Sequence, residues 1–86
     1  MYTITPKKKV IKFINSRNAK EKSRIRERFL ELENNPYPSN PKASIKKLKN
    51  RVGYRLRVGG YRFIYTIEED KLIILMIEAD NRGDIY

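Results

Sequence analysis

The chain has 86 residues and a strongly basic composition, and both limit what it can be. Twenty Lys and Arg residues against ten Asp and Glu residues give a formal net charge of +10, which favours a polyanionic partner such as a nucleic acid. The absence of Cys excludes disulfides and thiolate chemistry, and the absence of His removes the usual metal ligand and general base. We therefore expect no metal and no other cofactor.

The length and the hydropathy pattern predict a single domain over residues 1–86 that works in the cytoplasm. The apolar run at 72–77 is much too short to cross a bilayer. The N-terminal residues lack the apolar segment of a signal peptide. We expect a small, simple core, because a chain of this length buries only about 60% of the surface that its unfolded form exposes.

The first part of the chain predicts a strand and two helices. Residues 2–5 are rich in β-forming residues and precede a proline, as a short strand would. From Lys7 onward the apolar residues take helical spacing. Asn18 and Glu21 have the spacing of a capping box, which would begin a second helix. This helix should stop at Asn34-Asn35-Pro36, because proline cannot continue a helix. Two short helices with a tight connection favour an antiparallel hairpin.

The second part predicts an antiparallel sheet. Residues 35–43 contain three prolines and read as a loop, and after them the apolar residues alternate with a period of two. Gly59 and Gly60 predict a two-residue type I′ turn. A further turn at Glu69 and Asp70 leads to a last strand at 71–79, whose apolar run indicates a central strand covered on both faces. The fold class is therefore α+β: an N-terminal strand, an antiparallel helix hairpin and a three- or four-stranded antiparallel sheet.

The predicted hairpin gathers three arginines on one face of the sheet. A two-residue turn places position 57 opposite position 62, so alternation brings Arg55, Arg57 and Arg62 to the same side. The residues expected on the core side are Tyr54, Leu56, Val58, Tyr61, Phe63 and Tyr65. A solvated basic surface is one interpretation of the arginines. However, no acidic residue lies between Ser44 and Ile67, which favours an anion-binding face.

Four further basic residues precede the hairpin and extend this positive stretch. We expect them to contact RNA: Lys46, Lys47, Lys49 and Arg51. Glu78, at the end of the apolar strand, is expected to form a salt bridge with one of the arginines.

Two blocks of the sequence resemble RelE-type toxins of the RelE/ParE toxin–antitoxin superfamily. They are LKNRVGYRLRVGGYRFIY at 48–65 and NRGDIY at 81–86. The resemblance implies the same strand, helix-pair and sheet layout. It also implies a metal-independent, ribosome-dependent endoribonuclease that cleaves mRNA in the A site and is neutralised by a cognate antitoxin. The family's catalytic positions correspond to Arg55, Arg57, Arg62, Arg82 and Tyr86.

The chain departs from the family pattern at positions that bear on proton transfer. The resemblance implies Lys at the positions of Arg55 and Arg57, and His or a second Arg where this chain has Asp80 and Asn81. Arginine is a poor proton acceptor because it stays charged. Four residues remain candidates for the general base or acid: Lys47, Lys49, Glu78 and Tyr86.

Two other functions fit the same residues. The first is a ParE-like toxin that inhibits DNA gyrase by binding, without cleaving a nucleic acid. The second is a basic domain that binds RNA or the ribosome without toxicity. In the toxin hypotheses, the antitoxin would cover the basic face or a sheet edge with an acidic or amphipathic segment.

Overall fold

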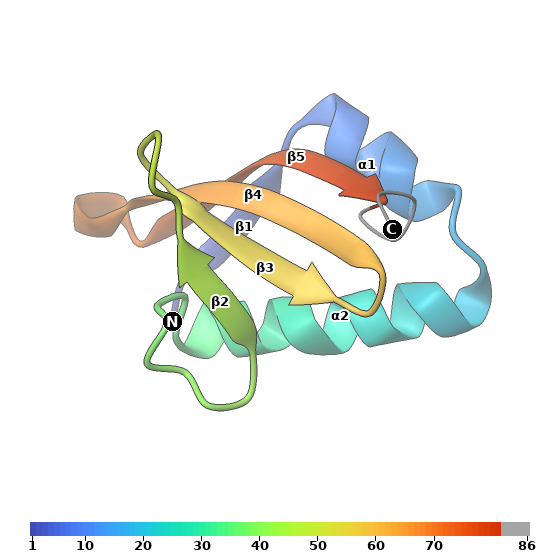
Figure 1. Ribbon diagram of the computed structural model, residues 1–86, viewed down its shortest axis with the longest axis horizontal. Coiled ribbons are helices and arrows are strands. Elements are labelled where there is room, and N and C mark those ends of the chain that lie inside the picture. The colour runs from blue at the N-terminus through green and yellow to red at the C-terminus, as the bar shows by residue number, and fades with distance from the viewer. Residues whose placement is uncertain (82–86) are drawn as a thin grey trace.

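A computed structural model describes residues 1–81 and confirms the predicted α+β class (Figure 1). The elements follow one another in this order: β1 (Thr3–Pro6), α1 (Lys8–Asn15), α2 (Ala19–Asn34), β2 (Ser44–Lys47), β3 (Tyr54–Val58), β4 (Tyr61–Glu68), a 3-10 turn (Glu69–Lys71) and β5 (Ile73–Asn81). Neither helix in this part of the chain is long and apolar enough to cross a membrane.

The five strands form one mixed sheet in the order β1-β5-β4-β3-β2. The four strands that follow the helices pair antiparallel, as expected. β1 adds to them in parallel with β5, so that it forms one edge of the sheet and β2 forms the other (Figure 1). The sequence gives no local signal for this parallel pairing, because the two strands lie far apart in the chain.

Two strands differ from their predicted form. The expected three- or four-stranded sheet allows a fourth strand, but the sequence does not locate it at β2, since SIKK contains two lysines and only Ile45 is buried. Lysines are tolerated there because β2 is an edge strand. β5 begins and ends two residues later than predicted. It is central, but its outward residues Ile73 and Leu75 are only half-buried, because both helices pack on the other face.

Phe63 of β4 lies at the centre of the core between the two helices. Its side chain is fully buried. The ring of Phe13 from α1 meets it edge-on at a centroid distance of 5.9 Å, and the ring of Phe29 from α2 does the same at 5.2 Å. Full burial of such a side chain stabilises a fold by about 1.5–3 kcal/mol. These contacts place both helices on one face of the sheet and leave the other face open.

Local side chains set the two ends of α2. The predicted capping box is present, since the Glu21 N–H donates to Asn18 Oδ1 at 2.8 Å and the Asn18 N–H donates to the Glu21 carboxylate. At the other end, the buried Asn40 side chain donates to the carbonyl oxygens of Glu31 and Asn35. The Glu31 carbonyl also accepts the Asn35 N–H at 2.9 Å, so Asn40 supplies a second donor to it and joins the loop to the last turn of the helix.

Tyr61 anchors the β3–β4 hairpin to the helices. Its hydroxyl donates to the Glu21 carboxylate, and this hydrogen bond is the main reason that the pKa of Glu21 is lowered. The Phe13 ring meets the Tyr61 ring edge-on at 5.4 Å, and the Arg17 guanidinium lies 5.2 Å from the Tyr61 ring centroid. The hairpin is thus held from its core side, which leaves its outer side available.

Glu69 ties the corner before β5 to the N-terminus and to the loop after α2. Its carboxylate accepts hydrogen bonds from the hydroxyls of Tyr2, at 2.6 Å, and Tyr37. These bonds stabilise the ionised carboxylate and lower its pKa below 4.5. The bonds to an ionised partner raise the pKa of both tyrosines, which stay neutral at physiological pH.

The first prediction concerns acid stability. The folded-state pKa of Glu69 is lowered, so its hydrogen bonds stabilise the fold above pH 4.5, and this contribution is lost as the pH falls through the lowered value. The double substitution Tyr2→Phe and Tyr37→Phe should therefore weaken the fall in stability between about pH 5 and pH 3. Urea denaturation across this range measures the effect. Identical pH slopes for the variant and the parent protein would contradict it.

Candidate functional site: a basic face of the sheet

The outer face of the sheet, away from the helices, carries two cross-strand rows of mostly charged residues. The first row runs across β2, β3, β4 and β5 as Lys46, Arg55, Ile64 and Glu78. The second runs in the same direction as Ser44, Arg57, Arg62 and Asp80. Cross-strand partners point to the same side of a sheet. Each row therefore begins with basic or neutral residues and ends in a carboxylate on β5.

We use the name basic face for six residues on this side and in the loop at 48–53: Lys46, Lys49, Arg51, Arg55, Arg57 and Arg62. Its strand members lie where the hairpin register predicts them, with Arg57 directly opposite Arg62. The core side of the hairpin is also as predicted, since its six apolar residues belong to the core or pack against it.

The turn that fixes this register differs in type from the prediction. Gly59 has a φ of +59°, whereas Gly60 is not in the positive-φ region. A type I′ turn needs positive φ at both positions, while a positive value at the first alone is the pattern of type II′. Both types close a two-residue hairpin loop, so the register of Arg57 and Arg62 is unchanged.

Two carboxylates of β5 pair with two of the arginines. Arg62 donates through Nε to Asp80 Oδ1 at 3.2 Å and through Nη2 to Asp80 Oδ2 at 2.9 Å. Arg51 Nη2 donates to Glu78 Oε2 at 2.7 Å, which confirms the expected salt bridge of Glu78 with an arginine. Both pairs are partly exposed, and pairs of this kind contribute only about 0–1 kcal/mol. An incoming phosphate can therefore compete with either carboxylate.

Arg55 and Arg57 are the accessible cations at the centre of the face. Within residues 1–81 neither side chain forms a hydrogen bond or an ion pair. Arg57 is exposed and Arg55 is half-buried. Their guanidinium groups can make planar, bidentate contacts to phosphate without first giving up a protein partner.

The loop at 48–53 borders two shallow hollows on the basic face. The Leu48 N–H donates to the Gly53 carbonyl oxygen at 3.0 Å, and the buried Gly53 has a φ of +130°. A side chain at this glycine would meet the carbonyl oxygen of Tyr65 at 2.8 Å, so only glycine lets the loop close against the sheet. A hollow of about 280 Å³ involves Lys46 and Arg55, and another of about 260 Å³ involves Arg62.

The remaining predicted site residues divide into three groups. Lys49 lines both hollows, and its RNA contact stays a prediction. Lys47 is paired with Tyr54 and faces the helix side, although it also lines the hollow beside Lys46. Arg82 and Tyr86 lie outside the described residues. Asp80 was not singled out as a partner of Arg62, although extending the hairpin register across β5 would have found it.

The chemistry available on this face is electrostatic. Glu78 is engaged by Arg51, so the carboxylate that the sequence offered as a base is held as an ion-pair partner. Lys49 is the one proton-transfer candidate that lines both hollows among the residues described. No cluster of three or more Asp or Glu side chains within residues 1–81 could hold a metal ion.

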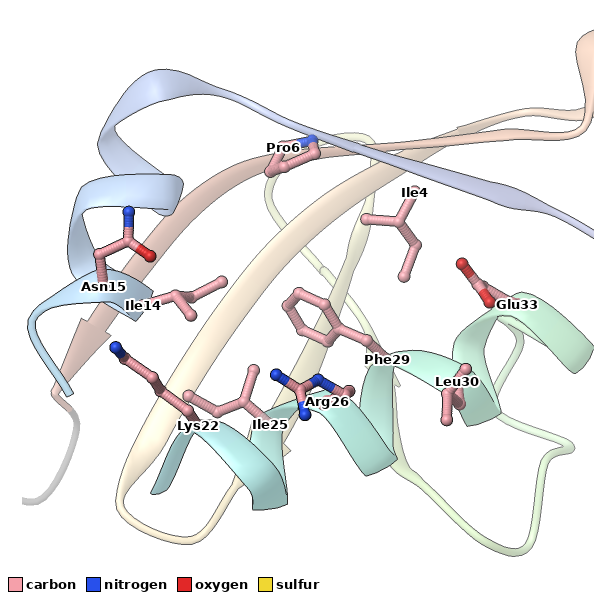
Figure 2. Close-up of a pocket in the computed structure, with 10 residues that line it drawn as sticks. All are labelled: Ile4, Pro6, Ile14, Asn15, Lys22, Ile25, Arg26, Phe29, Leu30 and Glu33. Carbon is pink, nitrogen blue, oxygen red and sulfur yellow. The ribbon is translucent and has the colours of Figure 1, made fainter. Parts of the chain in front are cut away.

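A separate groove of about 510 Å³ lies on the helix side. Figure 2 shows four apolar side chains that point into the space between α1, α2 and β1: Ile4, Ile14, Ile25 and Phe29. Lys22, Arg26 and Glu33 stand around them (Figure 2). This groove carries no array of cations comparable to the basic face, and it suits an apolar segment better than an anion.

Comparison with known proteins places this fold in a class of small toxins. A family model described as the ParE toxin of the type II toxin–antitoxin system parDE matches residues 7–85. The chain therefore belongs to this toxin family, within the RelE/ParE superfamily. No curated protein sequence matches the chain.

Solved structures of RelE proteins resemble the chain over nearly its whole length. The archaeal RelE–RelB complex from Pyrococcus horikoshii OT3 contains a chain with 28% identity and a TM-score of 0.82, over 95% of this chain and 96% of that one. The RelB–RelE antitoxin–toxin complex from Methanococcus jannaschii contains a chain with 28% identity and a TM-score of 0.71, over 94% of this chain and 93% of that one. A chain of the RelBE2 toxin–antitoxin complex from Mycobacterium tuberculosis shares the fold. It has 19% identity and a TM-score of 0.76, over 94% of this chain and 98% of that one.

The second prediction concerns the carboxylates that border the basic face. Asp80→Asn should remove the carboxylate that competes with phosphate for Arg62 and raise the affinity for a single-stranded oligonucleotide about two- to fivefold at a fixed salt concentration. Fluorescence anisotropy with a labelled oligonucleotide measures the change. Asp70→Asn, in the exposed 3-10 turn, removes the same charge and serves as the control. Equal affinities for the two variants would show that Asp80 does not limit anion binding.

Proposed function

We propose that this toxin is a metal-independent endoribonuclease of the RelE type, which cleaves mRNA in the ribosomal A site. The observation that carries the proposal is the arrangement of three guanidinium groups on one open face, with Arg55 and Arg57 unpaired within residues 1–81 and Arg62 opposite Arg57. The 28% identity to two archaeal RelE chains over almost the whole sequence supports it.

The reaction would use these groups to stabilise developing charge. A ribose 2′-hydroxyl would give its proton to a base and attack the adjacent phosphorus, and the bond to the 5′-oxygen of the next nucleotide would break as that oxygen takes up a proton, leaving a 2′,3′-cyclic phosphate. The attack places additional negative charge on the phosphoryl oxygens. Guanidinium groups that the sheet already holds in position stabilise this charge without reorganising during the reaction. Arg55 and Arg57 would bind the phosphoryl oxygens, and Arg62 would join them when the phosphate displaces Asp80.

The other proposed site residues would position the RNA. Lys46, Lys47, Lys49 and Arg51 would contact phosphates on either side of the cleaved bond, as cations in a groove follow a nucleic-acid backbone. Arg82 would contribute a further cation, and Tyr86 would stack on an unpaired base and orient it. The general base or acid is proposed among Lys49, Lys47 and Tyr86.

A cognate antitoxin is the proposed protein partner. Both similar archaeal chains were solved as complexes with RelB, which is the antitoxin of the Methanococcus jannaschii pair. An acidic segment of such a partner would neutralise the basic face, and an apolar segment would fit the groove between α1, α2 and β1. Binding at either surface leaves the core contacts of the toxin unchanged.

A second candidate function is inhibition of DNA gyrase by binding. The family match to a ParE toxin favours it, and so does the pairing of Arg62 with Asp80, which a non-cleaving protein can retain at no cost. Gyrase supercoiling assays with the purified toxin separate the two functions, because a ribosome-dependent nuclease leaves supercoiling unchanged.

The third prediction tests the proposed nuclease. Arg57→Gln should lower the rate of mRNA cleavage on programmed ribosomes about 100-fold or more, because one preorganised donor to a developing oxyanion commonly supplies that factor. Primer extension on the mRNA measures the rate and shows whether the cuts are in phase with the reading frame.

The matched control for this experiment is Arg26→Gln, which removes the same charge from α2 on the helix side. This variant should cleave at the parent rate. A folded Arg57→Gln protein that cleaves as fast as the control would refute the assigned site. An absence of cleavage by the parent protein, together with inhibited supercoiling, would support the ParE-like function instead.

A further inference from the structure

A third hollow, of about 610 Å³, lies beyond the loop at 48–53 on the helix side of the sheet. Its sheet residues Tyr54 and Ile67 belong to the face that packs on the helices, whereas the hollows of the basic face involve Arg62 and Arg55. The loop itself is common to both sides. The third hollow is therefore separated from the basic face only by one short loop.

Two tyrosine rings form a rigid corner in this hollow. The rings of Tyr37 and Tyr54 are perpendicular, with centroids 5.7 Å apart and an interplanar angle of 89°. Tyr54 stacks on the buried Tyr65 at 5.8 Å, while the Tyr37 hydroxyl is bonded to Glu69. Because these contacts fix both rings, a planar ligand that stacks there loses little affinity to ordering of the protein.

The charged side chains that line this hollow are all basic, while the nearby carboxylates of Glu69 and Glu78 are bonded to Tyr37 and Arg51. Lys47, Lys49 and Arg51 line the hollow, and no Asp or Glu does so. Each of these three cations also lines a hollow on the other side of the loop. Lys49 lines both of those hollows, Lys47 lines the one beside Lys46, and Arg51 lines the one beside Arg62. A polyanion bound on the basic face can thus cross the loop and contact basic side chains at each step.

We infer that the hollow at Tyr37 and Tyr54 binds an unpaired nucleobase of the RNA strand whose phosphates lie on the basic face. The inference rests on the proposed RNA-binding function and extends it by one nucleotide subsite. The base stacks in the tyrosine corner, and Lys47 and Lys49 contact the phosphates that join it to the rest of the strand. Aromatic stacking accepts any base, so this subsite adds affinity with little sequence preference.

A set of oligoribonucleotides with one abasic position each tests the subsite. The full chain is titrated with each labelled oligonucleotide, and the affinities are measured by fluorescence anisotropy. One abasic position should weaken binding by the parent protein about fivefold or more, which is the smaller end of what one stacked base contributes. Tyr37→Leu should weaken binding of the intact oligonucleotide by a similar factor and should not respond to the abasic change at that position.

Two control variants separate stacking from folding. Tyr37→Phe keeps the stacking ring and loses only the hydroxyl bond to Glu69, so it should retain the response to the abasic position that Tyr37→Leu loses. Tyr2→Phe removes a hydrogen bond to the same Glu69 but keeps the ring that meets Tyr37 edge-on, and it should keep the parent affinity.

Three outcomes would overturn the inference. Tyr37→Leu could retain its response to every abasic position, or it could bind RNA as tightly as the parent while losing affinity for an antitoxin segment, which would make that segment the occupant. Both results leave the proposed function intact if Arg55→Gln and Arg57→Gln still weaken RNA binding. If the parent protein binds none of the oligoribonucleotides, the inference and the RNA-contacting role of the basic face fail together.

Discussion

The structure depends on a hairpin that holds like charges side by side. Directly opposed arginines destabilise a strand pair by up to about 1 kcal/mol, and Arg57 and Arg62 are opposed in this way. Phe63 and the anchored Tyr61, both on the core side, keep the hairpin in register in spite of this repulsion. Packing on the core face of the sheet thus offsets the destabilisation that the repulsion between arginines causes on the other face. The open face can then be arranged for binding an anion.

The carboxylates of β5 limit this repulsion without removing it. Asp80 neutralises Arg62 and Glu78 neutralises Arg51, while Arg55 and Arg57 stay unneutralised within the described residues. The face is therefore graded from a cationic side at β2 and β3 to an acidic border at β5. In the proposed function, this gradient would favour a phosphate strand over β3 and the adjoining loop, where the hollow beside Lys46 and Arg55 lies.

The hairpin and its arginine face could be predicted because they follow from local rules. Strict alternation and a Gly-Gly turn determine which side chains share a face, and this holds whether the turn is type I′ or type II′. The parallel pairing of β1 with β5 could not be predicted, because the two strands lie far apart in the sequence. The strand at Ser44–Lys47 was missed for a different reason: its partner β3 follows after the loop at 48–53, but SIKK has too few β-forming residues to indicate a strand. The tyrosine corner could not be predicted either. Tyr37 lies in the loop after α2 and Tyr54 lies in β3, and only tertiary packing brings their rings together.

The most direct test of the account is to observe the arginine side chains while RNA binds. In a protein labelled with ¹⁵N-arginine, the Nε–H signals of Arg55, Arg57 and Arg62 should shift on titration with a short single-stranded RNA. Arg26, in the groove on the helix side, should not respond. Shifts at Arg26 with none at the three hairpin arginines would contradict the claim that the basic face is the nucleic-acid surface.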